Sequence, residues 1–185
     1  MQVWIESASG RDNHGGAGWE LGSCIWSPAH DRLGRTQKYG IMNAPRVGDQ
    51  VINCSAGLIV GISRVSRPAE TTSSGPPNPG AWGYARSFFR LNLDDYTQCE
   101  THVALNEVAK RFFARIREDI ETNRPKYYLY SLYPPSERNP TGKLVLAQGR
   151  FLARSTATLN GCVTACLAKR DREVFESRMA SSTER

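Results

Sequence analysis

The stretch Leu21–Val65, LGSCIWSPAHDRLGRTQKYGIMNAPRVGDQVINCSAGLIVGISRV, decides the fold of this chain. It opens with an apolar segment that ends in Trp26-Ser27-Pro28, and it closes with two runs rich in Val and Ile, residues 50–54 and 58–65. Two such runs around the tight turn Ser55-Ala56-Gly57 predict a buried β-hairpin. A tryptophan at the end of a strand can form one wall of a flat slot for a planar ring, so Trp26 is the first candidate binding residue.

The segments around this stretch predict an α+β fold. Alternating or apolar runs predict further strands at residues 2–7, 84–93, 126–133 and 144–154, the last with a glycine turn. The aromatic residues of 126–133 are equally compatible with a helix. Apolar residues at three- and four-residue steps predict helices over 101–122 and 157–179, the second capped by Ser155 or Thr156. This order favours a small curved open β-barrel of five to six strands with helices packed outside. We expect a single domain over residues 1–180, with 181–185 as a frayed tail or linker.

Composition narrows the class of protein. The chain has 185 residues, which suits one domain, and 24 Lys and Arg against 18 Asp and Glu, which favours a polyanionic partner. No apolar run approaches the ~20 residues that span a bilayer, so we expect a cytoplasmic protein without membrane contact. The five cysteines and three histidines lack the spacing of metal ligands, so no metal and no cofactor are expected.

The sequence offers little support for catalysis. The nucleophile-elbow pattern G-x-S-x-G, the zinc pattern H-E-x-x-H and the deaminase pattern of H-x-E with C-x-x-C are all missing. The acid pair Asp94-Asp95 is interpreted as a turn or helix entry in preference to a catalytic dyad. We therefore expect a binding module and not an enzyme.

Three segments carry a resemblance to a known superfamily. GSCIWSP (22–28) resembles the strand-plus-tryptophan signature of YTH domains, and RVGDQVINCSAGLIVGISRV (46–65) resembles the hairpin shared by EVE and related PUA-like domains. AWGYARSFFRL (81–91) resembles the later step in which a loop tryptophan precedes a sheet strand. The resemblance implies a PUA-like, EVE/YTH-type domain that reads a modified base in an aromatic cage. It also implies a setting in bacterial modification-dependent restriction, with cleavage in a fused or associated nuclease.

The chemistry of base reading assigns roles to individual residues. A base removed from its stack costs a few kcal/mol, which stacking on aromatic rings at ~1–3 kcal/mol per base must offset. Trp26 is the expected stacking wall, Trp82 or Tyr84 the second wall, and the Asn43 amide the reader of the base edge. The alternatives are a core role for Trp26, a loop-anchoring role for Trp82 and a turn role for Asn43. The complete predicted base pocket is Trp26, Ser27, Tyr39, Asn43, Ser55, Trp82 and Tyr84.

Basic residues around this pocket are candidates for contacts with the phosphate backbone. One group surrounds the proposed mouth, and it comprises Arg32, Arg35, Lys38 and Arg46. A second group comprises Arg86, Lys143, Arg150 and Arg154. The expected partner is DNA with methylated adenine or modified cytosine, and RNA with N6-methyladenosine is the second choice. The competing hypotheses are a small enzyme or small-molecule binder for a free nucleotide-like ligand, and a protein-interaction module.

Overall fold

The computed structural model describes residues 1–8, 19–36, 39–77, 79–123, 126–133, 135–137, 140, 142–147 and 151–180. The predicted α+β class is confirmed. The strands are β1 (Val3–Ala8), β2 (Cys24–Pro28), β3 (Gln50–Ser55), β4 (Leu58–Val65), β5 (Glu70–Thr72), β6 (Phe88–Ala104), β7 (Tyr130–Tyr133), β8 (Lys143–Leu146) and β9 (Leu152–Arg154). The helices are α1 (Leu105–Arg111), α2 (Phe113–Asn123), α3 (Ala157–Thr164) and α4 (Lys169–Ala180), with 3-10 turns η1 (Gly40–Asn43) and η2 (Gly80–Trp82).

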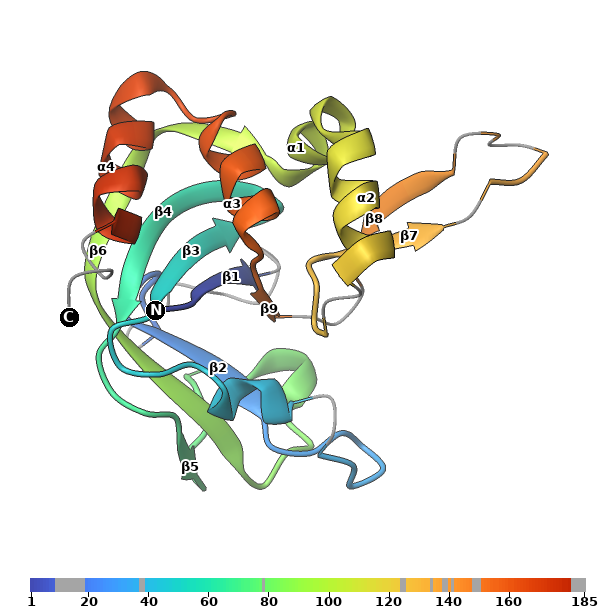
Figure 1. The fold of residues 1–185 in the computed structure, drawn as a ribbon. Coiled ribbons are helices and arrows are strands. Elements are labelled where there is room, and N and C mark those ends of the chain that lie inside the picture. The colour runs from blue at the N-terminus through green and yellow to red at the C-terminus, as the bar shows by residue number, and fades with distance from the viewer. Residues whose placement is uncertain are drawn as a thin grey trace.

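A single curled sheet forms the centre of the molecule. Its strands lie in the order β2-β6-β4-β3-β1-β9, and β5 adds to β6. Only β1 and β3 run parallel among these pairs, since the other neighbours are antiparallel. The predicted hairpin is β3–β4, with Ser55 opposite Leu58 at its turn. Figure 1 shows this sheet curving around the interior, as expected for an open barrel.

The long strand β6 joins β2 and β5 to the rest of the main sheet. Its first part pairs with β2 and β5, and its later part pairs with β4, with two shifts of register. Such irregularities bend a strand and increase its twist. The prediction of a turn or helix entry at Asp94-Asp95 was wrong, because both residues lie within β6. Asp94 instead forms a surface ion pair with Arg64 across the sheet, with Arg64 Nε 3.0 Å from Asp94 Oδ1.

The sheet has an apolar core on each face. On β1, Val3 and Ile5 face the helices, and Trp4 between them faces β2 and η1, as alternation in a strand requires. The helical side is packed by buried residues such as Leu105, Ile116, Leu159 and Phe175. The opposite core packs Trp4 with residues that include Ile25, Tyr39, Met42, Val51 and Leu91.

Both predicted helices are divided in two. The break in the first comes at Phe112, between α1 and α2, and α1 begins at Leu105 because β6 continues to Ala104. The second helix is divided between α3 and α4. The predicted cap is confirmed at Thr156, whose side-chain oxygen accepts a hydrogen bond from the Leu159 N–H. In the described residues, no helix combines the length and apolar character needed to cross a membrane.

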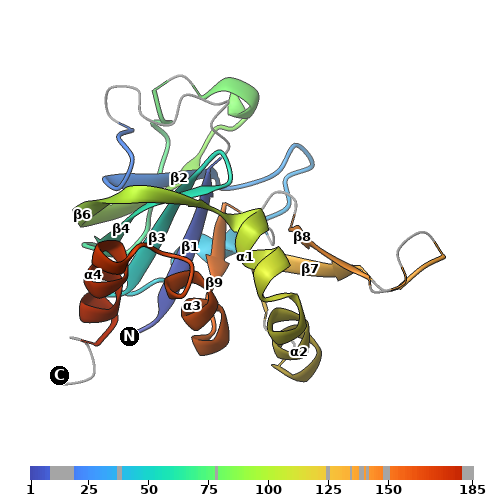
Figure 2. The same ribbon diagram turned by 90° about the horizontal axis from the view of Figure 1, so that it is seen from above.

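The residues predicted as strands at 126–133 and 144–154 form three strands, which belong to two different sheets. β7 and β8 pair with each other as a small two-stranded sheet, whereas β9 joins β1 in the main sheet. Figure 2 shows α3 and α4 together on one side of the main sheet and the β7–β8 pair extending away from it. The position of β9 matters for the site, because it brings Phe151 to the end of β1, where the Ser7 N–H donates to the Phe151 carbonyl at 2.9 Å.

Candidate nucleic-acid interface

Four aromatic rings from distant parts of the chain form one cluster. Tyr39 and Phe151 stack nearly parallel, with centroids 5.4 Å apart and planes 12° apart. Phe151 meets Trp82 edge to face at 5.9 Å, and Trp82 lies 5.6 Å from Trp19. Tyr39 and Trp19 are buried, but Trp82 and Phe151 are only half-buried. The cluster therefore has a partly exposed aromatic surface, formed by η2 and the residue before β9.

Trp26 lies next to this cluster and is itself covered. Its side chain is 5 % exposed and belongs to a buried group with Trp19, Cys24 and Phe88, against which Trp82 packs. The Phe88 ring meets it edge on at 6.4 Å, and the Arg90 guanidinium lies 5.3 Å from its ring centroid. The Trp26 Nε1 atom is buried and has no hydrogen-bond partner among the described residues. This packing fits the core interpretation, and a stacking role for Trp26 stays a prediction.

The three polar pocket residues are not brought together. Ser27 is fully buried on the opposite face of β2 from Trp26, and its hydroxyl donates to the Pro28 carbonyl at 3.3 Å. Asn43 is exposed at the end of η1. Ser55 lies half-buried at the tip of the β3–β4 hairpin, paired with Ala8 and Leu58. Their roles in reading a base edge remain predictions.

A groove adjoins the aromatic cluster. It has a volume of about 630 Å³ and lies between the segment after β2 and the segment before β6. Tyr84 connects the groove to the cluster, because it lines the groove and its side chain forms a hydrogen bond with that of Tyr39. Burial and this hydrogen bond raise the pKa of the Tyr39 hydroxyl. Tyr84 is 37 % exposed, and the Arg32 guanidinium lies 5.3 Å from its ring centroid. The lining residues are His30, Asp31, Arg32, Gly34, Tyr84, Ala85, Arg86 and Ser87.

The charge of this groove is positive. Arg32 and Arg86 are both exposed and both line it. The one carboxylate of the lining, Asp31, is engaged by its neighbour, with Arg35 Nη2 2.7 Å from Asp31 Oδ2. The backbone N–H of Arg35, with smaller contributions from its guanidinium and the Leu33 N–H, lowers the pKa of Asp31. Two of the predicted phosphate contacts, Arg32 and Arg86, are thus brought to one groove with Tyr84.

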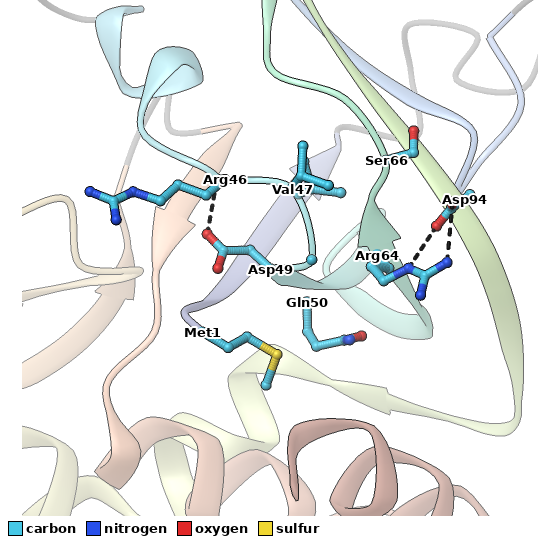
Figure 3. A pocket seen from close by; sticks show the side chains of 10 residues that line it. Met1, Arg46, Val47, Asp49, Gln50, Arg64, Ser66 and Asp94 are labelled. Carbon is cyan, nitrogen blue, oxygen red and sulfur yellow. Dashed lines mark hydrogen bonds and ion pairs between the residues drawn. The ribbon is translucent and has the colours of Figure 1, made fainter. Parts of the chain in front are cut away.

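Other predicted basic residues surround a different part of the surface. Arg46 and Arg154 line a cavity of about 430 Å³ beside Trp4 and Asp49. An adjoining cavity of about 530 Å³ also includes Arg46, together with Val47, Gln50 and the Arg64–Asp94 pair (Figure 3). Lys143 lies on β8, with its ammonium 5.7 Å from the Tyr133 ring centroid. Lys38 and Arg150 lie outside the described residues.

Asp49 organises these two cavities without neutralising an arginine side chain. Its carboxylate accepts hydrogen bonds from the Gln2 N–H at 2.8 Å, the Trp4 indole N–H at 2.9 Å and the Arg46 backbone N–H at 2.9 Å. Figure 3 shows the Arg46 guanidinium directed away from Asp49. The Arg154 Nε donates to the Gln2 side-chain oxygen at 2.9 Å. The Arg154 guanidinium is therefore held by a neutral partner, while Arg46 is anchored to Asp49 through its backbone only.

A buried polar chain crosses three strands of the sheet. Asn53 on β3 donates from Nδ2 to Glu6 Oε2 on β1 at 2.7 Å, and it accepts from the Ser63 hydroxyl on β4 at 2.9 Å. All three side chains are buried, and burial raises the pKa of Glu6 from 4.5 to about 7. Sequence reasoning missed this group, because a strand of alternating residues does not show which polar side chains face inward.

Sequence reasoning also missed Phe151 as a site residue. No local pattern marks Phe151, since its aromatic neighbours Tyr39 and Trp82 lie far away in the sequence. Within the described residues, no three His, Cys, Asp or Glu side chains are placed to hold a metal ion.

Comparison with known proteins gives similarities of fold only. No family model and no curated protein matches the chain. Similar solved structures include a Pseudomonas putida protein (13 % identity, TM-score 0.47, covering 89 % of this chain and 98 % of that one). They also include the N-terminal domain of Staphylothermus marinus McrB (13 % identity, TM-score 0.45, covering 88 % of this chain and 93 % of that one). A further similar structure is human THYN1 in complex with 5-methylcytosine-containing DNA (9 % identity, TM-score 0.46, covering 95 % of this chain and 98 % of that one). These similarities are too distant to assign a function to this chain.

Proposed function

We propose that this chain is a nucleic-acid-binding reader that accepts a modified base, turned out of a DNA strand, against its partly exposed aromatic surface. The observation that carries the proposal is the junction of that surface with a basic groove. Trp82 and Phe151 supply half-buried rings, and Tyr84 joins them through Tyr39 to the groove of Arg32 and Arg86. The ring of a base would contact the aromatic surface, and the phosphates of the same strand would contact the arginines of the groove.

The aromatic surface supplies the energy that base extrusion requires. Taking a base from its stack costs a few kcal/mol, and stacking on an aromatic side chain offsets ~1–3 kcal/mol of that cost. A methyl group on the base adds ~0.8 kcal/mol when its apolar surface is buried. Trp82 and Phe151 meet edge to face, 82° apart, so a ring lying on one of them would also contact the other. This corner suits one heteroaromatic ring with a small apolar substituent.

The groove supplies affinity that does not depend on the base sequence of the nucleic acid. Guanidinium groups bind phosphate oxygens and release counterions, which makes binding weaken as salt rises. Because Arg35 engages Asp31, the carboxylate in the groove opposes phosphate binding less than a free one would. Arg46 and Arg154 offer a second set of phosphate contacts around the separate cavity beside Trp4 and Asp49. In this proposal, the arginines position the strand and the aromatic corner selects the base.

The proposal includes a biological setting and its alternatives. We infer that the chain is the specificity module of a modification-dependent restriction system, with cleavage in another domain or subunit. DNA with methylated adenine or modified cytosine is the first substrate class, and RNA with N6-methyladenosine is the second. A free nucleotide-like ligand in the same corner would instead indicate a small-molecule binder or small enzyme.

The test is a binding panel of oligonucleotides that differ in one modification only. Tryptophan fluorescence is measured with unmodified DNA and with DNA containing N6-methyladenine, 5-methylcytosine or 5-hydroxymethylcytosine, each at two salt concentrations. Matched RNA with N6-methyladenosine and the free nucleosides complete the panel. A preference for one modified DNA with a steep salt dependence supports the proposal. Tight binding of a free nucleoside without salt dependence contradicts it in favour of the small-molecule alternative.

A further inference from the structure

The apolar side chain of Leu33 is highly exposed to water, which is unfavourable for an apolar group. Its side chain is 75 % exposed, more than any other large hydrophobic side chain among the described residues. It lies at the tip of the turn that follows β2, between Arg32 and Arg35. Isolated exposed apolar residues are common on protein surfaces, so exposure alone does not define a function. Two further features of Leu33 indicate a function: the ordered turn that carries it and the basic groove beside it.

The turn that carries Leu33 is held by a network of hydrogen bonds around Asp31. The Asp31 Oδ1 atom accepts from the backbone N–H groups of Leu33 and Arg35, each at 2.9 Å. The Asp31 backbone N–H donates to the Arg35 carbonyl at 3.0 Å, and the Gly34 N–H donates to the Asp31 carbonyl at 2.9 Å. A loop closed in this way presents its tip side chain in a defined position. Little ordering entropy is then lost when that side chain enters a partner.

The position of the tip is the rim of the basic groove. The residues on either side of Leu33, Arg32 and Gly34, both line the groove, and the Arg32 guanidinium lies over the Tyr84 ring. Tyr84 in turn contacts Tyr39 of the aromatic cluster. An apolar side chain, two flanking guanidiniums and an aromatic surface therefore follow one another along one edge of the molecule.

We propose that Leu33 is a wedge that enters the base stack of a duplex and occupies the space left by the extruded base. This inference rests on the proposed function and names its substrate class as double-stranded DNA. Apolar side chains inserted at a base step offset lost stacking and stabilise a distorted duplex. Arg32 and Arg35 would contact phosphates on either side of the opened step. A single strand has no partner stack to hold open, so the wedge would add nothing to its binding.

The experiment compares duplex and single-stranded DNA that carry the same preferred modification. The variant is Leu33→Ala, and the matched control is Val47→Ala, another exposed apolar residue (59 % exposed) that lines a separate cavity. We expect Leu33→Ala to weaken duplex binding by about tenfold, from the apolar contact that is lost, and to leave single-strand binding within about twofold. Leu33→Phe, which keeps an apolar wedge, should retain duplex binding, and Val47→Ala should leave both unchanged.

A second readout reports the opening of the stack directly. A 2-aminopurine placed beside the modified base fluoresces more strongly when its stacking is lost, so wild-type protein should raise its signal and Leu33→Ala should raise it less. Equal weakening of duplex and single strand by Leu33→Ala, or an unchanged fluorescence rise, would overturn the wedge while the reader function stands. Absence of any preference for modified DNA in the wild-type protein would instead overturn the proposed function itself.

Discussion

The rings of Tyr39 and Phe151 stack 5.4 Å apart and within 12° of parallel, although one precedes η1 and the other precedes β9. This stack fixes one end of the aromatic surface, because Phe151 also meets Trp82 edge to face. The pairing of β9 with β1 places Phe151 there, so the strand order of the main sheet also forms the proposed corner.

Phe151→Ala should remove one side of the corner. We expect binding of the preferred modified DNA to fall by about tenfold to a hundredfold, since a stacking ring contributes ~1–3 kcal/mol per base. Binding of unmodified DNA should change much less, because the arginines are retained. Phe113→Ala is the matched control, since Phe113 is also a half-buried phenylalanine but lies on α2. Equal losses for modified and unmodified DNA would argue against a reading role for Phe151.

Trp26→Ala should act mainly on stability. The Trp26 side chain is 5 % exposed and packs against Phe88, so its truncation should lower the free energy of unfolding by ~3–5 kcal/mol. Trp82→Ala should cost less stability because Trp82 is half-buried, and it should lose discrimination between modified and unmodified DNA. Urea denaturation followed by circular dichroism measures the first effect. A stable Trp26→Ala protein that has lost discrimination would restore Trp26 as a stacking wall.

Arg32 and Arg86 should contribute salt-dependent affinity. Each single alanine variant should weaken modified and unmodified DNA alike and lower the slope of log K against log salt by about one, as expected for one lost phosphate contact. The control is Arg117→Ala, because Arg117 pairs with Glu121 on the surface of α2. A change in base preference without a change in slope would show that these arginines read the base and not the backbone.

Glu6 should make stability depend on pH. Burial raises the pKa of Glu6 from 4.5 to about 7, so the folded state holds this proton more tightly than the unfolded state. Its contribution is fully present below about pH 4.5 and is lost as pH rises to about 7, a change of about 3 kcal/mol. Glu6→Gln should flatten the stability profile between these values, while Glu118→Gln, at an exposed site on α2, should leave it unchanged. An identical profile for Glu6→Gln and wild type would rule out Glu6 as the source.

The sequence predicted the elements with strong local signals. The β3–β4 hairpin, the strand that contains Trp26 and the Thr156 cap follow from apolar runs, turn residues and capping chemistry, and all three are present. The extension of β6 to Ala104 was missed because pairing with β4 overrides the local preference around Asp94 and Asp95. The apolar spacing that predicts one helix over 101–122 continues across the break at Phe112, so it could not show the division.

The candidate site could be predicted only in part. Sequence pattern identified Tyr39, Trp82, Tyr84, Arg32 and Arg86, which the structure brings to one region. It could not place Phe151, since that position depends on the pairing of β9 with β1. It also grouped Ser27 with Trp26, although neighbouring residues of a strand face opposite sides.

The most direct measurement of the central claim is the affinity of the wild-type protein for duplexes that differ only by one modified base. The account predicts that one modification is bound at least about tenfold more tightly than the unmodified duplex, and that Phe151→Ala abolishes this ratio. Equal affinity for every duplex of the panel, with the same ratio in Phe151→Ala, would contradict it.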